Sequence, residues 1–95
     1  MKAAVTFQSV LKDHLANPRQ AAKYLTACYE EGHEVFLQGL RDVVDAQGGM
    51  ARTARLTGLN RENLYRQLSR RGNPSLASLS AVLAVLGIKL RFAAG

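Results

Sequence analysis

Residues that begin and end helices recur along this chain and leave room only for short helical segments. Asn17 can accept hydrogen bonds from the free N–H groups of a first helical turn, and Pro18 fits the first helical position. Paired glycines at 48–49 break the helical pattern, and the Arg-Gly-Asn-Pro cluster at 71–74 is typical of a turn. With 95 residues, the chain is long enough for one compact domain that buries a core without disulfides or metal ions.

Apolar residues recur at helical spacing between these breaks. Leu76, Leu79 and Leu83, for example, lie three or four residues apart and share one face of a helix. Ser75 can cap that helix, and Gly87 can end it. We therefore expect five helices, over about residues 18–31, 34–47, 50–56, 61–69 and 76–86.

The segment Ile88–Phe92 alternates apolar and basic residues, which is the period of a β-strand. A lone strand leaves its backbone groups unpaired, so it needs a partner from the same domain, a second copy or another protein. The alternative is a short disordered tail. The expected fold is all-α, with five helices and a short C-terminal β-strand, in a single domain over residues 1–95. That domain has a helical extension at about 1–47, a core at about 48–87 and the strand at about 88–92.

Positive charge is concentrated in the second half of the chain. Residues 1–49 contain five Lys or Arg and six Asp or Glu, a net charge of −1, whereas residues 50–95 contain eight and one, a net charge of +7. Six of these cations are arginines between positions 52 and 71, and arginine offers a planar fork that fits phosphate oxygens and guanine edges. The asymmetry favours nucleic acid as a partner, with a solvated basic face as the alternative.

Five residues in this basic segment fit the packing of a helix-turn-helix. A small residue, Ala54, suits the close crossing of two helices, and Gly58 suits a turn that needs a positive φ angle. Leu59 can fill the angle between the helices, while Leu64 and Leu68 are i, i+4 neighbours that can face the core. An ordinary helical hairpin with a charged surface is the alternative interpretation.

The remaining side chains of the helix at about 61–69 are mostly polar, and the N-terminal part of such a helix enters the major groove of DNA. Arg61 and Arg66 could each donate two hydrogen bonds to guanine, and Glu62 could accept one from cytosine. A second group of residues is expected to contact the DNA backbone, which positions the protein without specifying the sequence. That group consists of Arg52, Asn60, Tyr65, Arg70, Arg71 and Asn73.

The stretches TGLNRENLYRQLS and GNP, within a region of about residues 17–92, resemble the phage-repressor-like (lambda-repressor-like) helix-turn-helix proteins. More narrowly, the region resembles the addiction-module antidote proteins, which are antitoxins encoded beside a small RelE-like toxin. The resemblance implies a five-helix fold with a short terminal strand, operator binding that represses the protein's own operon, and neutralisation of a toxin. It implies a groove-facing role for Arg61, Glu62, Asn63 and Arg66. Thr53 and Gln67 depart from the pattern, because such proteins usually have apolar residues there.

The sequence lacks the residue groupings of the usual catalytic and metal sites. Cys28 is the only cysteine, so neither a disulfide within one chain nor a cysteine zinc site can form. His14 and His33 do not have metal-ligand spacing, and Asp42 and Asp45 are expected on a solvated helix face. There is no glycine-rich phosphate-binding motif. We therefore expect no enzyme activity, no metal and no cofactor.

The partners expected from the sequence are double-stranded DNA and a toxin protein. No apolar run is long enough for a signal peptide or a membrane span, so we expect a cytoplasmic protein without membrane contact. A homodimer is expected, because helix-turn-helix proteins usually bind two half-sites. The alternatives are a stand-alone regulator without a toxin and a helical protein-interaction module whose basic face meets an acidic partner. RNA is disfavoured, because the segment lacks an aromatic stacking platform.

Overall fold

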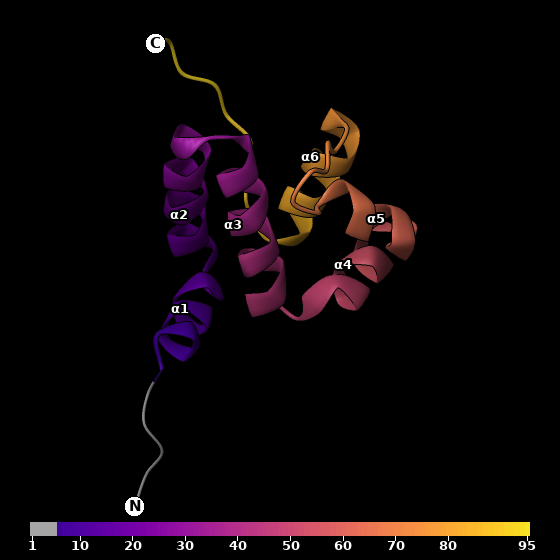
Figure 1. Cartoon of the computed structure of the whole chain (residues 1–95), viewed down its shortest axis with the longest axis horizontal. Helices are drawn as coiled ribbons and strands as arrows, with labels where there is room; N and C mark the ends of the chain where they lie inside the picture. The colour runs from indigo at the N-terminus through magenta and orange to yellow at the C-terminus, as the bar shows by residue number, and fades with distance from the viewer. Residues whose placement is uncertain (1–5) are drawn as a thin grey trace, which may run out of the picture.

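The computed structural model describes residues 6–95, which form helices joined by short loops (Figure 1). The six helices are α1 (Phe7–Leu15), α2 (Pro18–Glu31), α3 (His33–Ala46), α4 (Gly49–Thr57), α5 (Arg61–Gln67) and α6 (Leu76–Val85). The all-α class predicted from the sequence is confirmed for this part of the chain. None of these helices is both long enough and apolar enough to cross a membrane.

The prediction of five helices is wrong, because the structure contains an additional helix, α1, before Asn17. Thr6 caps this helix: its Oγ1 accepts a hydrogen bond from the N–H of Ser9 at 3.0 Å. Leu15 is the one fully buried residue of α1. Val10, Leu11 and Leu15 recur at helical spacing after the Thr6 cap, so the sequence did carry a signal for this helix that the prediction did not use.

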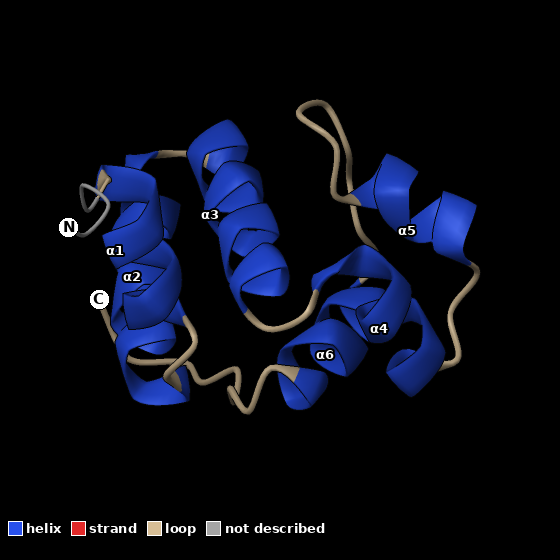
Figure 2. Ribbon diagram, turned by 90° about the horizontal axis from the view of Figure 1, so that it is seen from below, coloured by secondary structure: helices blue, strands red, loops and turns tan. Residues whose placement is uncertain are grey.

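The predicted C-terminal strand is also wrong, since residues 6–95 contain no β-strand (Figure 2). Gly87, at a φ of +78°, ends α6, and Ile88 donates its N–H to the carbonyl oxygen of Leu83 at 2.9 Å. The N–H of Gly87 reaches the carbonyl oxygen of Ala84 at 3.1 Å, which completes a Schellman motif. A strand needs a neighbouring strand, so alternation of apolar and basic residues does not produce one here.

Three helices begin at the side-chain caps predicted from the sequence. Asn17 Oδ1 accepts hydrogen bonds from the backbone N–H groups of Arg19 and Gln20, at 2.9 and 3.2 Å. Asn60 caps α5 at 2.9 Å, and Ser75 caps α6 at 3.0 Å. These bonds satisfy N–H groups that a first helical turn leaves free, and they confirm the predicted starts of α2, α5 and α6.

Helix α3 connects the two halves of the fold (Figures 1 and 2). Helices α1 and α2 pack against α3, whereas α4 packs against α3, α5 and α6. Among the described helices, α5 packs on α4 alone. One apolar core runs through both halves, and its largest fully buried side chains include Leu15, Leu37, Leu40, Val43, Leu64, Leu68, Val82 and Leu86.

Gly39 permits the close contact between α2 and α3. A Cβ atom at this position would lie 2.7 Å from Sγ of Cys28, which leaves no space for a side chain. Cys28 is buried, as expected for a packing residue, and burial raises the pKa of its thiol. A raised pKa keeps the thiol protonated and unreactive at neutral pH.

Tyr24 gives the fold a contribution to stability that depends on pH. Burial, together with a hydrogen bond from its hydroxyl to Asp42 Oδ2 at 2.8 Å, raises the pKa of Tyr24 above its ordinary value of 10.0. The folded state therefore holds this proton more tightly than the unfolded state. This contribution is complete below about pH 10 and is lost as the pH rises above that value.

We expect the free energy of unfolding to fall more steeply above about pH 10 in the unmodified protein than in the Tyr24→Phe variant. The Phe variant lacks both the titrating hydroxyl and its bond to Asp42, so it should be less stable at neutral pH. Urea unfolding at about pH 8 and about pH 11 measures both effects. If the free energy of unfolding falls by the same amount between these two pH values in both proteins, groups other than Tyr24 cause the alkaline loss of stability.

Candidate nucleic-acid interface

The arginine-rich segment 52–71 covers most of α4 and all of α5, which are joined by the turn Gly58–Asn60. Gly58 has a φ of +76°, a conformation that favours glycine, and it donates its N–H to the carbonyl oxygen of Ala54 at 2.9 Å. The Oγ1 of Thr57 accepts a hydrogen bond from the N–H of Leu59 at 3.2 Å. Together with the Asn60 cap, these bonds fix the direction in which α5 follows α4.

The residues assigned to helix packing lie around this turn. Leu64 and Leu68 are 1% and 0% exposed, and Ala54 of α4 is 7% exposed. Leu59 is partly buried against the same core, whereas Gly58 has nothing within 4 Å of the place where a Cβ would stand. Gly58 therefore serves the turn through its backbone conformation, and the leucines attach α5 to the core.

Thr53 and Gln67 are polar where helix-turn-helix proteins usually have apolar residues, and both have hydrogen-bond partners. Thr53 is fully buried, and its hydroxyl donates to the carbonyl oxygen of Gly49 at 3.0 Å. Gln67 Oε1 accepts from the N–H of Ser75 at 3.3 Å, which joins the end of α5 to the start of α6. Neither residue disrupts packing, because a polar group that is paired can be buried at little cost.

The four side chains predicted to contact bases are all exposed on the outer face of α5: Arg61, Glu62, Asn63 and Arg66. The guanidinium of Arg61 lies over the ring of Tyr65, 5.5 Å from its centroid, and its Nη2 donates to the Tyr65 hydroxyl at 3.4 Å. Arg66 donates to the side-chain oxygen of Asn63. Each guanidinium has five donors, so these local bonds leave most of them available to a ligand.

The residues predicted to contact the DNA backbone divide into two groups. Some are exposed on α5 or in the loops beside it: Asn60, Tyr65, Arg71 and Asn73. The other two already bond to α3 or its C-terminal end. Arg52 donates to the carbonyl oxygen of Gln47 at 2.9 Å, and Arg70 donates to Oε1 of Glu34 at 3.2 Å. The Arg70–Glu34 pair is exposed, at 76% and 58%, and such a pair contributes little to stability.

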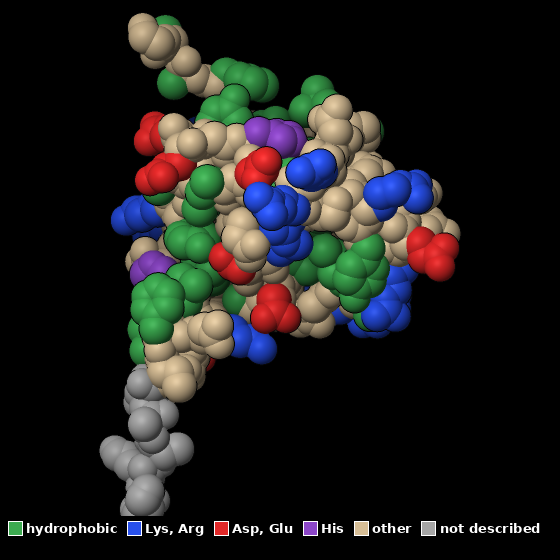
Figure 3. Space-filling model, viewed as in Figure 1, with side chains coloured by type: hydrophobic (Ala, Val, Ile, Leu, Met, Phe, Trp, Pro, Cys, Tyr) green, Lys and Arg blue, Asp and Glu red, His purple; other side chains and the backbone are tan. Residues whose placement is uncertain are grey.

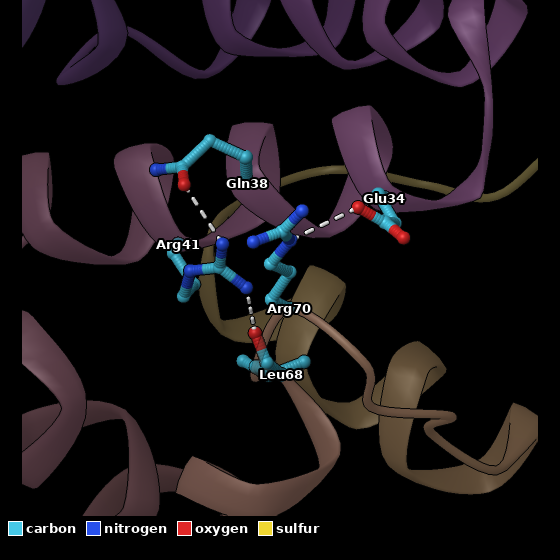
Figure 4. A network of polar contacts seen from close by, with 5 residues as sticks. All are labelled: Glu34, Gln38, Arg41, Leu68 and Arg70. Atoms are coloured by element: carbon cyan, nitrogen blue, oxygen red, sulfur yellow. Dashed lines mark hydrogen bonds and ion pairs between the residues drawn. The ribbon is translucent and has the colours of Figure 1, made fainter.

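Helix α3 holds the end of α5 through a residue that the sequence analysis did not single out. Arg41 donates to the carbonyl oxygen of Leu68 and, through Nη2, to Oε1 of Gln38 at 2.8 Å (Figure 4). Gln38 in turn donates to Asp42 at 3.0 Å, the carboxylate that Tyr24 also contacts. A continuous series of hydrogen bonds thus connects α2 to the last turn of α5.

Two further residues of α3 hold the loop that follows α5. His33 Nε2 lies 2.9 Å from the carbonyl oxygen of Gly72 and donates to it. Glu34 accepts from Arg70 in the same loop (Figure 4). The sequence offers no signal for these contacts, because the partners lie 36 and 39 residues apart. We call His33, Glu34 and Arg41 the α3 anchor residues.

Gly72 lies so close to the end of α5 that a side chain would not fit. A Cβ atom there would stand 2.0 Å from the carbonyl oxygen of Gln67 and 2.7 Å from that of Arg66. We expect Gly72→Ala to displace the loop and to lower the free energy of unfolding by about 1–3 kcal/mol. Urea unfolding measures the loss, with Gly95→Ala as the control because that position has open space. Equal stability of the two variants would contradict the expectation.

Charge is distributed unevenly over the surface. Figure 3 shows Lys and Arg side chains gathered on the side of α4 and α5, whereas most Asp and Glu side chains lie on the side of α1–α3. Within residues 6–95, no three His, Cys, Asp or Glu side chains are grouped so that they could hold a metal ion. The exposed arginines of α5 thus form a surface that suits a polyanion.

Comparison with known proteins shows the family of the chain. The model of a family described as probable addiction module antidote protein matches residues 6–94. The chain belongs to this family. An uncharacterized protein from Haemophilus influenzae is 32% identical over 80 residues, which cover 83% of this chain and 81% of that protein. No solved structure matches the chain.

Membership of the antidote family supports the antitoxin part of the resemblance seen in the sequence. An addiction module pairs an antidote with a toxin, so the antidote family implies a toxin partner in general. The family match spans all six helices and most of the C-terminal segment. It therefore includes α1, the helix that the sequence pattern did not predict.

Proposed function

We propose that this antitoxin is a sequence-specific repressor that binds double-stranded DNA, represses its own operon and neutralises a RelE-like toxin. In this proposal α4 and α5 form a helix-turn-helix of the phage-repressor-like kind, and α5 enters the major groove. The protein acts in the cytoplasm by binding, without enzymatic chemistry. The observation that carries the proposal is the division of α5 into a buried leucine face and an exposed arginine face.

The dimensions and chemistry of α5 support contact with DNA bases. Its seven residues span about 10 Å along the helix axis, and the major groove is about 12 Å wide. Arg61 and Arg66 have the donors that bind O6 and N7 of guanine in pairs, and Glu62 can accept from cytosine. Asn63 lies among them on the exposed face and can pair with adenine through its side-chain amide.

The surrounding residues support contacts to phosphates. Arg71 and Asn73 are exposed in the loop after α5, and Tyr65 lies on its side. Arg70 can exchange its exposed partner Glu34 for a phosphate at little cost, because a surface ion pair is weak. A homodimer would place two such helices on half-sites about 34 Å apart, which doubles the sequence that is recognised.

Titration of a labelled duplex from the protein's own promoter tests the proposal, with a scrambled duplex of equal length beside it. We expect tight binding to the promoter alone, with an affinity that falls steeply with salt because arginine contacts release counterions. Equal weak binding to both duplexes would show that the basic surface attracts DNA without recognising its sequence, and would contradict the proposal. Co-expression with the adjacent gene tests the toxin part: rescue of growth by the antitoxin is expected.

A further inference from the structure

An apolar groove opens between α2, α6 and the C-terminal segment 88–92, which are elements that the proposed DNA contact does not use. Its volume is about 570 Å³. The side chains that line it include Tyr29, Phe36, Leu76, Leu79, Leu83 and Leu90. The rings of Tyr29 and Phe36 meet edge to face, with their centroids 5.7 Å apart. The groove is therefore lined by aromatic and aliphatic groups from both halves of the fold.

Large apolar side chains around this groove are exposed to solvent. Tyr29 is 69% exposed, Leu76 is 66% exposed and Phe92 is 90% exposed. Exposed apolar groups gathered around one groove mark an interaction surface. Phe92 lines the groove beside Leu90 but is still 90% exposed, so most of its ring is free to contact a second molecule.

We infer that the occupant of this groove is the C-terminal segment 88–92 of a second copy of the chain. The segment borders its own groove, so one twofold rotation places each segment against the groove of the other copy. Leu90, at 44% exposure, and Phe92 supply the apolar side chains that enter. This inference rests on the homodimer in the proposed function and specifies the surface that forms it.

The charges around the groove match the same occupant. The segment carries Lys89 and Arg91, and α2 ends with the exposed residues Glu30 and Glu31. Thr26 lines the groove, and Glu30 lies one helical turn after it on the same face of α2. Glu30 therefore lies at the edge of the groove. A twofold axis perpendicular to the segment makes the second segment run antiparallel to the first. Lys89 of the second copy then approaches the acidic end of α2.

Analytical ultracentrifugation of the full chain, without DNA or toxin, tests the inference. We expect a dimer whose dissociation constant rises by about 100-fold in Phe92→Ser, because symmetry removes the same apolar contact twice. Phe7→Ser is the matched control, since Phe7 is 77% exposed on α1 at the other end of the molecule (Figure 1). Both variants change an exposed side chain, and circular dichroism verifies that they fold.

A charge exchange tests the orientation of the two copies. Glu30→Lys should weaken the dimer about tenfold, because Lys89 of the second copy then meets a like charge. Adding Lys89→Glu to the same chain should restore the original dissociation constant. Failure of the second substitution to restore dimerisation would overturn the antiparallel placement.

Disulfide trapping distinguishes a second copy from other occupants. Lys89→Cys and Glu30→Cys, the pair that the antiparallel placement brings together, are placed in separate chains, each with Cys28→Ala, and the two proteins are mixed and oxidised. We expect a disulfide-linked heterodimer, which only contact between copies can give. A chain that stays monomeric at all concentrations, or a dimer equally sensitive to Phe92→Ser and Phe7→Ser, would overturn the inference. Loss of toxin binding in Phe92→Ser with an intact dimer would assign the groove to the toxin instead.

These measurements are independent of the DNA-binding proposal. If the dimer forms through the groove but the promoter duplex is not bound, the inference stands and the repressor function fails. If the promoter is bound by a chain that never dimerises, the repressor function stands and the inference fails.

Discussion

Replacement of Arg61 and Arg66 by glutamate is expected to abolish specific binding to the operator. Each arginine that pairs with a guanine contributes about 1–3 kcal/mol of discrimination, so loss of both lowers affinity by roughly 30-fold to 10⁴-fold. The new carboxylates add repulsion from the DNA backbone. Fluorescence anisotropy with the promoter duplex measures the loss. The core should be unaffected, because both side chains are exposed and bond only within α5.

The matched control for this experiment is the pair Arg19→Glu and Lys23→Glu on α2. Both residues are exposed, and the change in net charge is the same, but α2 belongs to the other half of the fold. We expect the control to lose little affinity for DNA, because the added negative charges act only through long-range repulsion. Added salt should screen that repulsion and remove the loss. Equal losses in the two double variants would show that the outer face of α5 is not the DNA-binding surface.

Leu64→Ala is expected to have the largest effect on stability among substitutions in α5. Leu64 is 1% exposed, and removal of a buried leucine side chain costs about 2–5 kcal/mol. A domain of this size has a total stability of about 5–15 kcal/mol, so the loss is a large fraction. Because α5 packs only on α4 among the described helices, loss of this contact should also lower DNA affinity by detaching the helix.

Urea unfolding compares this variant with Leu56→Ala, which removes the same side chain from an exposed position of α4. Leu56 is 51% exposed, so its replacement should cost less than about 1 kcal/mol. Similar losses for the two variants would contradict the assignment of Leu64 to the core. A loss of DNA binding in Leu64→Ala without a loss of stability would instead place Leu64 on the binding surface.

The parts of the fold that the sequence predicted correctly depend on contacts between near neighbours. The caps at Asn17, Asn60 and Ser75 bond to residues two or three positions away, and such bonds follow from residue type and spacing. The burial of Leu64 and Leu68 follows in the same way from helical periodicity, because they lie one turn apart.

The parts that the sequence did not predict depend on distant contacts or on a missing neighbour. Helix α1 is the exception, because its Thr6 cap and the helical spacing of Val10, Leu11 and Leu15 were local signals that the prediction did not use. The α3 anchor residues bond to partners 27 to 39 residues away, which no local pattern encodes. The alternation at residues 88–92 has strand period, but a strand needs a partner that the described chain does not contain.

The separation of the outer face of α5 from the contacts that hold the helix has a consequence for the evolution of modules of this kind. The side chains on its outer face serve neither the core nor the contacts that position the helix, which come from its leucines and from α3. Substitutions on that face can therefore accumulate without loss of the fold. If α5 binds DNA as proposed, duplicated copies of such a module in one genome can diverge in the DNA sequences that they recognise while they keep one scaffold.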